Sequence, residues 1–269
     1  MLACVFWTVP EPTERRYLVR LLTSLGRTAK RQVLKNPILR KMFGEQIRWS
    51  AGNKLVTCLR NNRIDLVVDI GANVGQTQEL LRDYGYSGDI LSIEPGDEAH
   101  AVLLEKSVAD SRWAIAPRMA IGAEVGRSRI NIARASDLSS LLTASPTLRA
   151  TYPGSEAIRT EEVEIVPLDE ILEPYWSRYE SIFVKVDTQG FEEAVLDGAR
   201  DSLRRIAGIQ LELSLVELYE GEPNYLGVLR RLSELGFEPH LILETNFSFH
   251  LRRQVQFDLV AFRSGSQPK

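Results

Sequence analysis

Cysteine is scarce in this sequence, since Cys4 and Cys58 are the only two among 269 residues. Two cysteines cannot form the disulfide framework of a small secreted domain, so we expect unpaired thiols in the reducing cytoplasm. Long apolar runs are lacking as well. The run from Leu2 to Val9 is interrupted by Thr8 and has no basic residue before it. It is too short to span a bilayer and lacks the basic start of a signal peptide, so we expect neither.

The sequence has no strong excess of charge of either sign. A net charge of −3 and a pI near 5.8 argue against wholesale nucleic-acid binding. The hydrophobic fraction of 44% and the charged fraction of 26% are those of a soluble globular protein. With 269 residues and no internal repeat or dividing linker, the chain has room for one large α/β domain with a sizeable core.

Basic residues are concentrated near the start. Ten of them and one acid lie between Arg15 and Arg48, and apolar residues recur at helical spacing from Tyr17 to Leu25. Pro37 divides the segment, and a further helix is expected around 53–62. We therefore predict a helical, basic N-terminal extension over residues 1–62. It either forms a solvated cap on the domain or lies as an amphipathic helix on an anionic membrane surface.

The rest of the chain is organised around the stretch from Leu66 to Gln76, which reads LVVDIGANVGQ. Its apolar start is typical of a parallel strand that is buried on both faces. Gly71 and Gly75 follow, and a helix is expected over 77–84. Glycines at such a turn allow a ligand to approach the backbone and the helix N-terminus. The pattern predicts a ligand-binding turn between a strand and a helix.

The missing middle glycine decides between ligands. A dinucleotide fingerprint reads G-x-G-x-x-G, but Asn73 occupies the position where the second glycine would stand. An NAD-dependent oxidoreductase therefore remains only an alternative. S-adenosylmethionine (SAM) has no phosphate and binds through its ribose and its amino-acid tail, which needs a less close approach. Glu94, at the end of an expected strand over 89–94, is placed to accept hydrogen bonds from both ribose hydroxyls.

Strands and helices alternate through the remaining sequence. Further strands are expected over 113–116, 161–166, 181–187, 206–213, 237–243 and 257–262, with 129–132 as a candidate antiparallel strand, and further helices over 97–106, 167–172, 191–199 and 224–235. This order implies a mostly parallel sheet with right-handed crossovers, whereas the last two strands have no room for a helix between them and should be antiparallel. Residues 136–153 are rich in Ser, Thr and Pro and are expected to form a loop or a mobile lid near the site.

Seven motifs in order give the chain a family resemblance: VDIGANVG at 68–75, IEP at 93–95, AIG at 120–122, VPLD at 166–169, VKVDTQGFE at 184–192, VLDG at 195–198 and LELS at 211–214. With these motifs the chain resembles the FkbM family of SAM-dependent O-methyltransferases from about Leu66 to Phe262. Thr188 is a small departure from the family pattern. The resemblance implies an α/β, Rossmann-like class I methyltransferase domain over residues 63–269, with a mostly parallel seven-stranded sheet and an antiparallel last strand. It also implies methyl transfer to a hydroxyl, often on a sugar or a polyketide.

Ligands of such sheets lie outside the carboxyl ends of the strands, where the strand order reverses. We expect SAM along the glycine turn, its ribose on Glu94, and its adenine near Ala120, Gly122 and the loop at 137–139. The expected cofactor-binding residues are Asp69, Gly71, Asn73, Gly75, Gln76, Glu94, Ala120, Gly122, Asp137, Ser139 and Asp187.

A hydroxyl acceptor needs a general base or a metal ion to remove its proton. Asp187 is the first candidate base, with holding the amino group of SAM as its alternative role. Glu212, on the next strand, would complete a carboxylate pair that suits a divalent cation, so a metal is an open option. His250 is a third candidate if the segment between the last two strands forms an acceptor pocket; otherwise it is a surface histidine.

These expectations combine into a cytoplasmic SAM-dependent O-methyltransferase that acts on a hydroxyl of a glycolipid, glycoside or polyketide-like acceptor. If the basic extension contacts the inner membrane face, the acceptor belongs to a lipid. A SAM-binding partner subunit without catalytic activity is the alternative outside enzymes.

Overall fold

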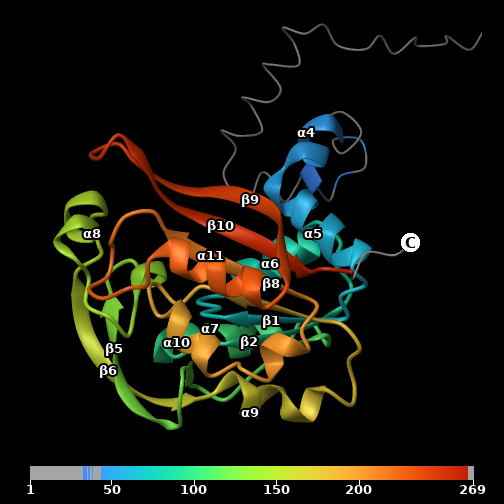
Figure 1. The fold of residues 1–269 in the computed structure, drawn as a ribbon, viewed down its shortest axis with the longest axis horizontal. Coiled ribbons are helices and arrows are strands. Elements are labelled where there is room, and N and C mark those ends of the chain that lie inside the picture. Colours follow the sequence, from blue (N-terminus) through green and yellow to red (C-terminus); the bar gives the residue numbers. More distant parts are fainter. Residues whose placement is uncertain (1–32, 35, 37, 39–43, 266–269) are drawn as a thin grey trace, which may run out of the picture.

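The computed structural model describes residues 33, 34, 36, 38 and 44–265. Its centre is a seven-stranded sheet with helices on both faces, and a three-stranded sheet lies at one side (Figure 1). Most of the basic segment from Arg15 to Arg48 and the dividing Pro37 fall outside the described residues. No helix in the described part of the chain is long and apolar enough to cross a membrane.

The central sheet has the strand order β3-β2-β1-β7-β8-β10-β9. Its strands are β1 (Leu66–Ile70), β2 (Asp89–Ile93), β3 (Trp113–Ile115), β7 (Ile182–Val186), β8 (Gly208–Ser214), β9 (Phe237–Ser248) and β10 (Arg253–Arg263). The pairs among the first five strands of this order are parallel, whereas β10 is antiparallel to both β8 and β9. The predicted mostly parallel sheet with an antiparallel last strand is confirmed.

Two hydrophobic clusters cover the two faces of the sheet, because alternate residues of a strand point to opposite sides. Val68 packs in the cluster under α9 (Leu168–Leu172), α10 (Glu192–Asp197) and α11 (Tyr225–Glu234). Val67 packs in the other cluster, under α5 (Ala51–Asn61), α6 (Gln76–Asp83) and α7 (Asp97–Ser107). α4 (Gly44–Trp49) directly precedes α5. The predicted boundary at residue 62 falls between α5 and β1 and stays a prediction.

The second sheet has the order β4-β6-β5, formed by β4 (Ala120–Ile121), β5 (Gly126–Ala133) and β6 (Ala157–Val166). The sequence predicts strands here but not that they leave the main sheet. The connection from β5 to β6, expected as a loop, contains a 3-10 turn at Ser136–Leu138 and the helix α8 (Pro146–Thr151). Ser145 starts this helix, since its side chain accepts a hydrogen bond from Leu148 N at 3.1 Å and Pro146 has the fixed φ of a first helical turn.

The last two strands form a longer hairpin than the sequence predicts. β9 continues to Ser248 and β10 begins at Arg253, so only a short turn joins them and part of the expected loop is strand. The reason is the antiparallel ladder itself, which continues beyond the apolar residues through pairs such as Gln254 with Phe247. Polar residues extend a strand when the partner strand supplies the hydrogen bonds.

Candidate functional site

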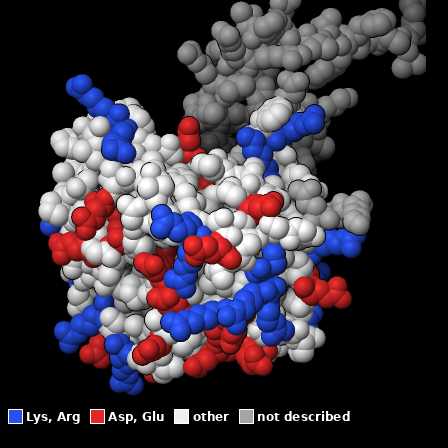
Figure 2. All heavy atoms as spheres, viewed as in Figure 1, with Lys and Arg blue, Asp and Glu red and all other residues white. Residues whose placement is uncertain are grey.

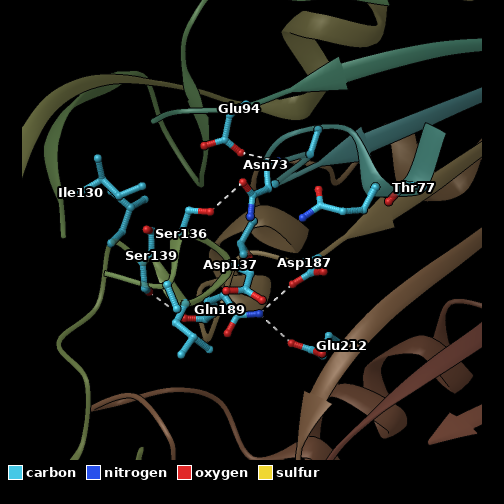
Figure 3. A pocket seen from close by; sticks show the side chains of 18 of the residues that line it. Asn73, Thr77, Glu94, Ile130, Ser136, Asp137, Ser139, Asp187, Gln189 and Glu212 are labelled. Atoms are coloured by element: carbon cyan, nitrogen blue, oxygen red, sulfur yellow. Dashed lines mark hydrogen bonds between the residues drawn. The ribbon is translucent and has the colours of Figure 1, made fainter. Parts of the chain in front are cut away.

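A cleft of about 450 Å³ opens at the carboxyl ends of β1, β2, β7 and β8. It lies where the strand order reverses, since β2 and β3 follow β1 on one side and β7 lies on the other. Glycine-turn residues, the 135–141 loop and the ends of β7 and β8 line it. In Figure 3, Glu94 and Glu212 lie on opposite sides of the cleft, and Gln189 reaches toward Asp187 and Glu212.

Both glycines of the turn are required by packing within the protein. Gly71 has φ +78°, and a Cβ on it would lie 1.9 Å from the carbonyl oxygen of Asp187. Gly75 has φ +89°, and a Cβ there would lie 2.8 Å from the ring of Trp113. Gly71 lines the cleft but Gly75 does not. Gly75 makes room for Trp113, and its expected contact with the cofactor stays a prediction.

Asn73 and Glu94 fix the glycine turn to the end of β2. Asn73 has a left-handed backbone with φ +46°, and its N–H donates to Glu94 Oε2 at 2.7 Å. Gly96 N donates to Glu94 Oε1 at 2.8 Å. Glu94 is only 7% exposed, and this burial raises the pKa of its carboxyl to about 7. Ser136 Oγ donates to Asn73 Oδ1 at 3.2 Å, so the 135–141 loop contacts the glycine turn across the cleft.

Asp69 lies fully buried behind the glycine turn, beside Lys185. The two residues are neighbours on β1 and β7, and Lys185 Nζ lies 3.4 Å from Asp69 Oδ1 and 3.0 Å from Asp187 Oδ2. Neither carboxylate oxygen of Asp69 has a well-oriented hydrogen-bond donor among the described residues. Burial raises the pKa of Asp69. Burial opposes the charge of Lys185, but Asp187 and Asp69 hold its pKa above the ordinary value.

Gln189 joins the two carboxylates that the sequence singles out. Its Nε2 donates to Asp187 Oδ1 at 2.8 Å and to Glu212 Oε2 at 2.7 Å, and Gln256 Nε2 also donates to Glu212 Oε2 at 2.9 Å. Desolvation, followed by the charges of Asp187 and Asp258, raises the pKa of Glu212 well above 4.5. Glu212 is thus a buried carboxyl group with a raised pKa, a feature common among groups that transfer protons in active sites.

The loop that carries Gln189 is held by Glu192. Glu192 Oε1 accepts hydrogen bonds from Thr188 N at 3.0 Å, Thr188 Oγ1 at 3.1 Å and Gly190 N at 3.2 Å. Gln189 itself has φ +55°, a conformation that few residues other than glycine adopt. Glu192 therefore stabilises the strained turn from which the side chain of Gln189 reaches the cleft.

The charge of the cleft selects the class of ligand. Its charged lining residues are the acids Glu94, Asp137, Asp187 and Glu212 and the single base Lys185. An acidic lining repels the pyrophosphate of NAD and attracts the sulfonium and ammonium groups of SAM. The residues present therefore fit SAM.

The structure brings most of the predicted residues together. Those that line the cleft are Gly71, Asn73, Gln76, Glu94, Asp137, Ser139, Asp187 and Glu212. Ala120 and Gly122 do not line it, because the second sheet buries them: Ala120 packs against Ile130 and Val163, and a Cβ on Gly122 would meet Ile165 at 2.7 Å. The expected adenine contact at these two residues stays a prediction, whereas the 135–141 loop, the other part of that expectation, adjoins the cleft.

His250 lies in the turn between β9 and β10, where it is exposed and does not line the cleft. Asn246, four residues earlier, does line it and donates to Gln256 Oε1 at 2.8 Å. Because β9 and β10 are longer than expected, the turn that joins them, with His250, does not reach the cleft at the carboxyl ends of β1, β2, β7 and β8.

Several lining residues were not singled out from the sequence. Lys185 carries the clearest signal, because a charged residue in an otherwise apolar buried strand needs a partner of opposite charge. Gln189 and Tyr152 carry no such signal. The Tyr152 hydroxyl is buried without a hydrogen-bond partner among the described residues, so it is a free polar group beside the cleft.

Within the described residues, no group of three or more His, Cys, Asp or Glu side chains is placed to hold a metal ion. The amide N–H groups of Gln189 occupy the space between Asp187 and Glu212 where a shared cation would bind. As it stands, this pair does not fit the divalent cation that the sequence left open.

Comparisons with known proteins were made for sequence and for structure. A search of curated proteins gave no significant match. Similar solved structures include a SAM-dependent methyltransferase from Aquifex aeolicus, with 12% identity, coverage of 88% of this chain and 98% of that chain, and a TM-score of 0.40. Another is magnesium protoporphyrin IX methyltransferase from Synechocystis PCC 6803 with bound SAM, with 12% identity, coverage of 96% and 100%, and a TM-score of 0.44. A putative O-methyltransferase from Klebsiella pneumoniae has 14% identity, coverage of 94% and 97%, and a TM-score of 0.42.

The methyltransferase FkbM domain matches residues 69–239, which include the glycine turn, Glu94, Asp187 and Glu212. This range is more than half of the chain, and it favours methyl transfer over the NAD-dependent alternative. The protein therefore belongs to the FkbM family of methyltransferases.

Proposed function

We propose that the protein methylates a hydroxyl group of a sugar-containing acceptor, either a glycoside or a glycolipid. The observation that carries this proposal is the buried carboxylate of Glu212, which faces the cleft and has a raised pKa. A hydroxyl is a poor nucleophile until a base takes its proton, and a carboxylate with a raised pKa is better suited to that task. SAM, when bound, supplies a methyl group that is already activated on a positively charged sulfur.

Glu212 is the better placed of the two candidate bases. Gln189 and Gln256 both donate to its Oε2, which leaves Oε1 without a partner among the described residues and available for the proton of an acceptor hydroxyl. Asp187, in contrast, already binds Lys185 Nζ and the amide of Gln189. These contacts suit its alternative role, in which it contributes with Asp69 to the negative field that holds the amino group of SAM.

The other end of the cleft suits the nucleoside. Glu94 ends β2 and offers carboxylate oxygens for the two ribose hydroxyls, as an acid does at this place in nucleotide-binding sheets. Ile130, Leu138 and Leu141 supply apolar surface on the same side for an adenine base. The chain thereby orients the cofactor, which accounts for much of the rate enhancement expected of a transfer from an activated donor.

The lining near Glu212 supports a sugar over a polyketide-like acceptor. Asn246 and Tyr152 adjoin this end of the cleft, and the buried hydroxyl of Tyr152 has no hydrogen-bond partner among the described residues. A hydroxyl-rich acceptor can satisfy such a group, whereas an apolar chain would leave it unpaired at a cost of about 1–3 kcal/mol. The scarcity of cysteine remains the support for a cytoplasmic location.

The test combines binding with turnover. Calorimetric titration with SAM, S-adenosylhomocysteine and NAD should show binding of the first two and none of NAD. Methyl transfer from labelled SAM should then be measured on panels of glycosides, glycolipids and polyketide-like alcohols, with mass spectrometry of the product. Methylation of a sugar hydroxyl supports the proposal. Methylation of a polyketide alcohol or of a nitrogen or carbon atom overturns the acceptor class, and SAM binding without any turnover favours the partner-subunit alternative.

A further inference from the structure

The far end of the β9–β10 hairpin carries an exposed aromatic cluster. Phe247 is 51% exposed, Phe249 88% and Leu251 36%. The two phenylalanine rings contact each other edge to face, with centroids 5.2 Å apart and an interplanar angle of 69°. We call residues 247–253 the hairpin tip. Exposed phenylalanine side chains that cluster in this way are unusual on a protein surface without a partner.

The charge around this cluster is positive. His250, Arg252 and Arg253 are exposed in the hairpin tip, and the stretch 246–256 contains no acid, although the whole chain has a net charge of −3. Neither arginine forms an ion pair with a carboxylate in the part of the chain that the structure describes. Figure 2 shows Lys and Arg side chains extending from the corner of the molecule where Figure 1 places the hairpin end. The hairpin tip therefore combines apolar insertion groups with free positive charge.

The shape of the hairpin tip decides which partner it fits. It is the end of a two-stranded ribbon that projects beyond the sheet (Figure 1). A stable protein interface needs about 800 Å² on each partner, which three side chains at a ribbon end do not provide. Insertion between lipid headgroups needs no opposing surface, and basic residues gain energy from an anionic leaflet. We propose that the hairpin tip inserts into the interfacial layer of an anionic lipid bilayer.

The hairpin tip is directly connected to the cleft. Asn246, the residue before Phe247, lines the cleft, and alternate strand residues point to opposite faces, so Phe247 points away from it. Phe249 lies in the turn that follows β9, three residues beyond Asn246 and therefore at most about 10 Å from it. Docking at a membrane would thus hold the Glu212 end of the cleft near the headgroups. Resting on the proposed function, this favours a lipid-linked sugar as the methyl acceptor.

The proposal is tested by flotation of the full chain with phosphatidylcholine vesicles, with and without one quarter phosphatidylglycerol. The apolar variant is Phe247→Ser with Phe249→Ser, and the charge variant is Arg252→Gln with Arg253→Gln. The controls are Val125→Ser and Arg127→Gln with Arg129→Gln, which change exposed residues in and beside β5, outside the hairpin tip. All changed side chains are exposed, so circular dichroism and thermal melting should match the wild type.

We expect the wild type and both controls to bind the anionic vesicles, and each hairpin-tip variant to lose at least about ten-fold in partition coefficient. A Phe249→Trp variant should add an emission component that brominated lipids quench. Equal binding of the tip variants and the wild type overturns the proposal, as does absence of binding. A change in oligomeric state of the apolar variant in light scattering, without vesicle binding, would instead assign the hairpin tip to contact with a second copy. None of these readouts needs methyl transfer, so their failure leaves the proposed function intact.

Discussion

Gln189 Nε2 lies 2.7 Å from Glu212 Oε2, inside a network that leaves the amide no second orientation. The same Nε2 donates to Asp187 Oδ1, while the Tyr219 hydroxyl lies 2.9 Å from Gln189 Oε1. An amide flip would place the oxygen of Gln189 against both carboxylates, so the two carboxylates fix Nε2 toward them, and the Tyr219 hydroxyl then donates to Oε1. Glu212 is thereby held through Oε2 at the lining of the cleft.

The first prediction concerns Glu212→Gln. A glutamine has nearly the same shape and keeps an oxygen for the amides of Gln189 and Gln256, but it cannot take a proton. We expect kcat to fall by about 10²–10⁴-fold, the usual contribution of general base catalysis. Calorimetry should show SAM affinity changed by less than about three-fold, because Glu212 is placed toward the acceptor.

Asp187→Asn provides the comparison for the first prediction. If Asp187 contributes to the field that holds the amino group of SAM, this variant should raise the Kd for SAM more than it lowers kcat. The opposite pattern, with normal turnover in Glu212→Gln and lost turnover with intact SAM binding in Asp187→Asn, would make Asp187 the base. Since the base must be deprotonated, kcat/KM of the wild type should rise with pH through the raised pKa of Glu212.

A second prediction concerns cofactor binding by Glu94. Removal of this buried carboxylate in Glu94→Ala should weaken SAM binding by about 1–3 kcal/mol, because the ribose hydroxyls lose their acceptor. The pKa of Glu94 is about 7, and only the carboxylate form accepts hydrogen bonds with both oxygens. SAM affinity of the wild type should therefore rise as pH increases through about 7, and Glu94→Gln should lose this pH dependence. Unchanged affinity in Glu94→Ala would show that the ribose lies elsewhere.

The sequence predicts the main sheet well because its strands are short apolar runs between helices of regular period. β1 and β7 are recognisable in this way, and the order of elements implies the parallel pairing. The separate sheet of β4, β5 and β6 was not predicted, because alternation in a strand such as β5 indicates a half-buried strand but not which sheet it joins. The long hairpin was missed for a related reason: Asn246 and Ser248 are strand residues only because β10 pairs with them.

The sequence predicts those residues of the site that directly follow a strand. Glu94 and Asp187 follow apolar runs directly, so their place at the cleft follows from topology. Ala120 and Gly122 lie outside the cleft lining because small residues also serve close packing, here within the second sheet and against Phe191. Gln189 could not be found, since its role depends on a left-handed backbone that Glu192 stabilises through contacts within the folded loop.

A third prediction compares two glycines with the same backbone conformation. Gly71 and Gly221 both have φ +78°, but a Cβ on Gly71 would lie 1.9 Å from the carbonyl oxygen of Asp187, whereas nothing lies within 4 Å of one on Gly221. Gly221→Ala should cost about 1–2 kcal/mol for the left-handed conformation alone. Gly71→Ala must in addition separate β1 from β7. It should therefore lower the free energy of unfolding, measured with denaturant, by at least about 2 kcal/mol more than Gly221→Ala does. Equal losses would show that the two strand ends move apart freely.

The fourth prediction follows from the burial of Glu192. Burial raises the pKa of this carboxyl from 4.5 to about 7 in the folded protein. Between these two values the folded state binds more protons than the unfolded state, so the contribution of Glu192 to stability falls as pH rises. Above about pH 7 the full cost of the buried charge is present, at most about 3 kcal/mol. At pH 4.5 and below it disappears.

Glu192→Gln separates this charge from the hydrogen bonds, because all three loop contacts fall on Oε1, an atom that glutamine keeps. Urea unfolding should show the variant more stable than the wild type at pH 8, by about 1–3 kcal/mol, and nearly equal to it at pH 5. Glu193→Gln, an exposed change on the same helix, is the control and should stay within about 0.5 kcal/mol of the wild type at both pH values. A difference that is the same at pH 5 and pH 8 would mean that Glu192 does not take up its proton on folding. The loop of Gln189 would then be held by a permanently charged carboxylate.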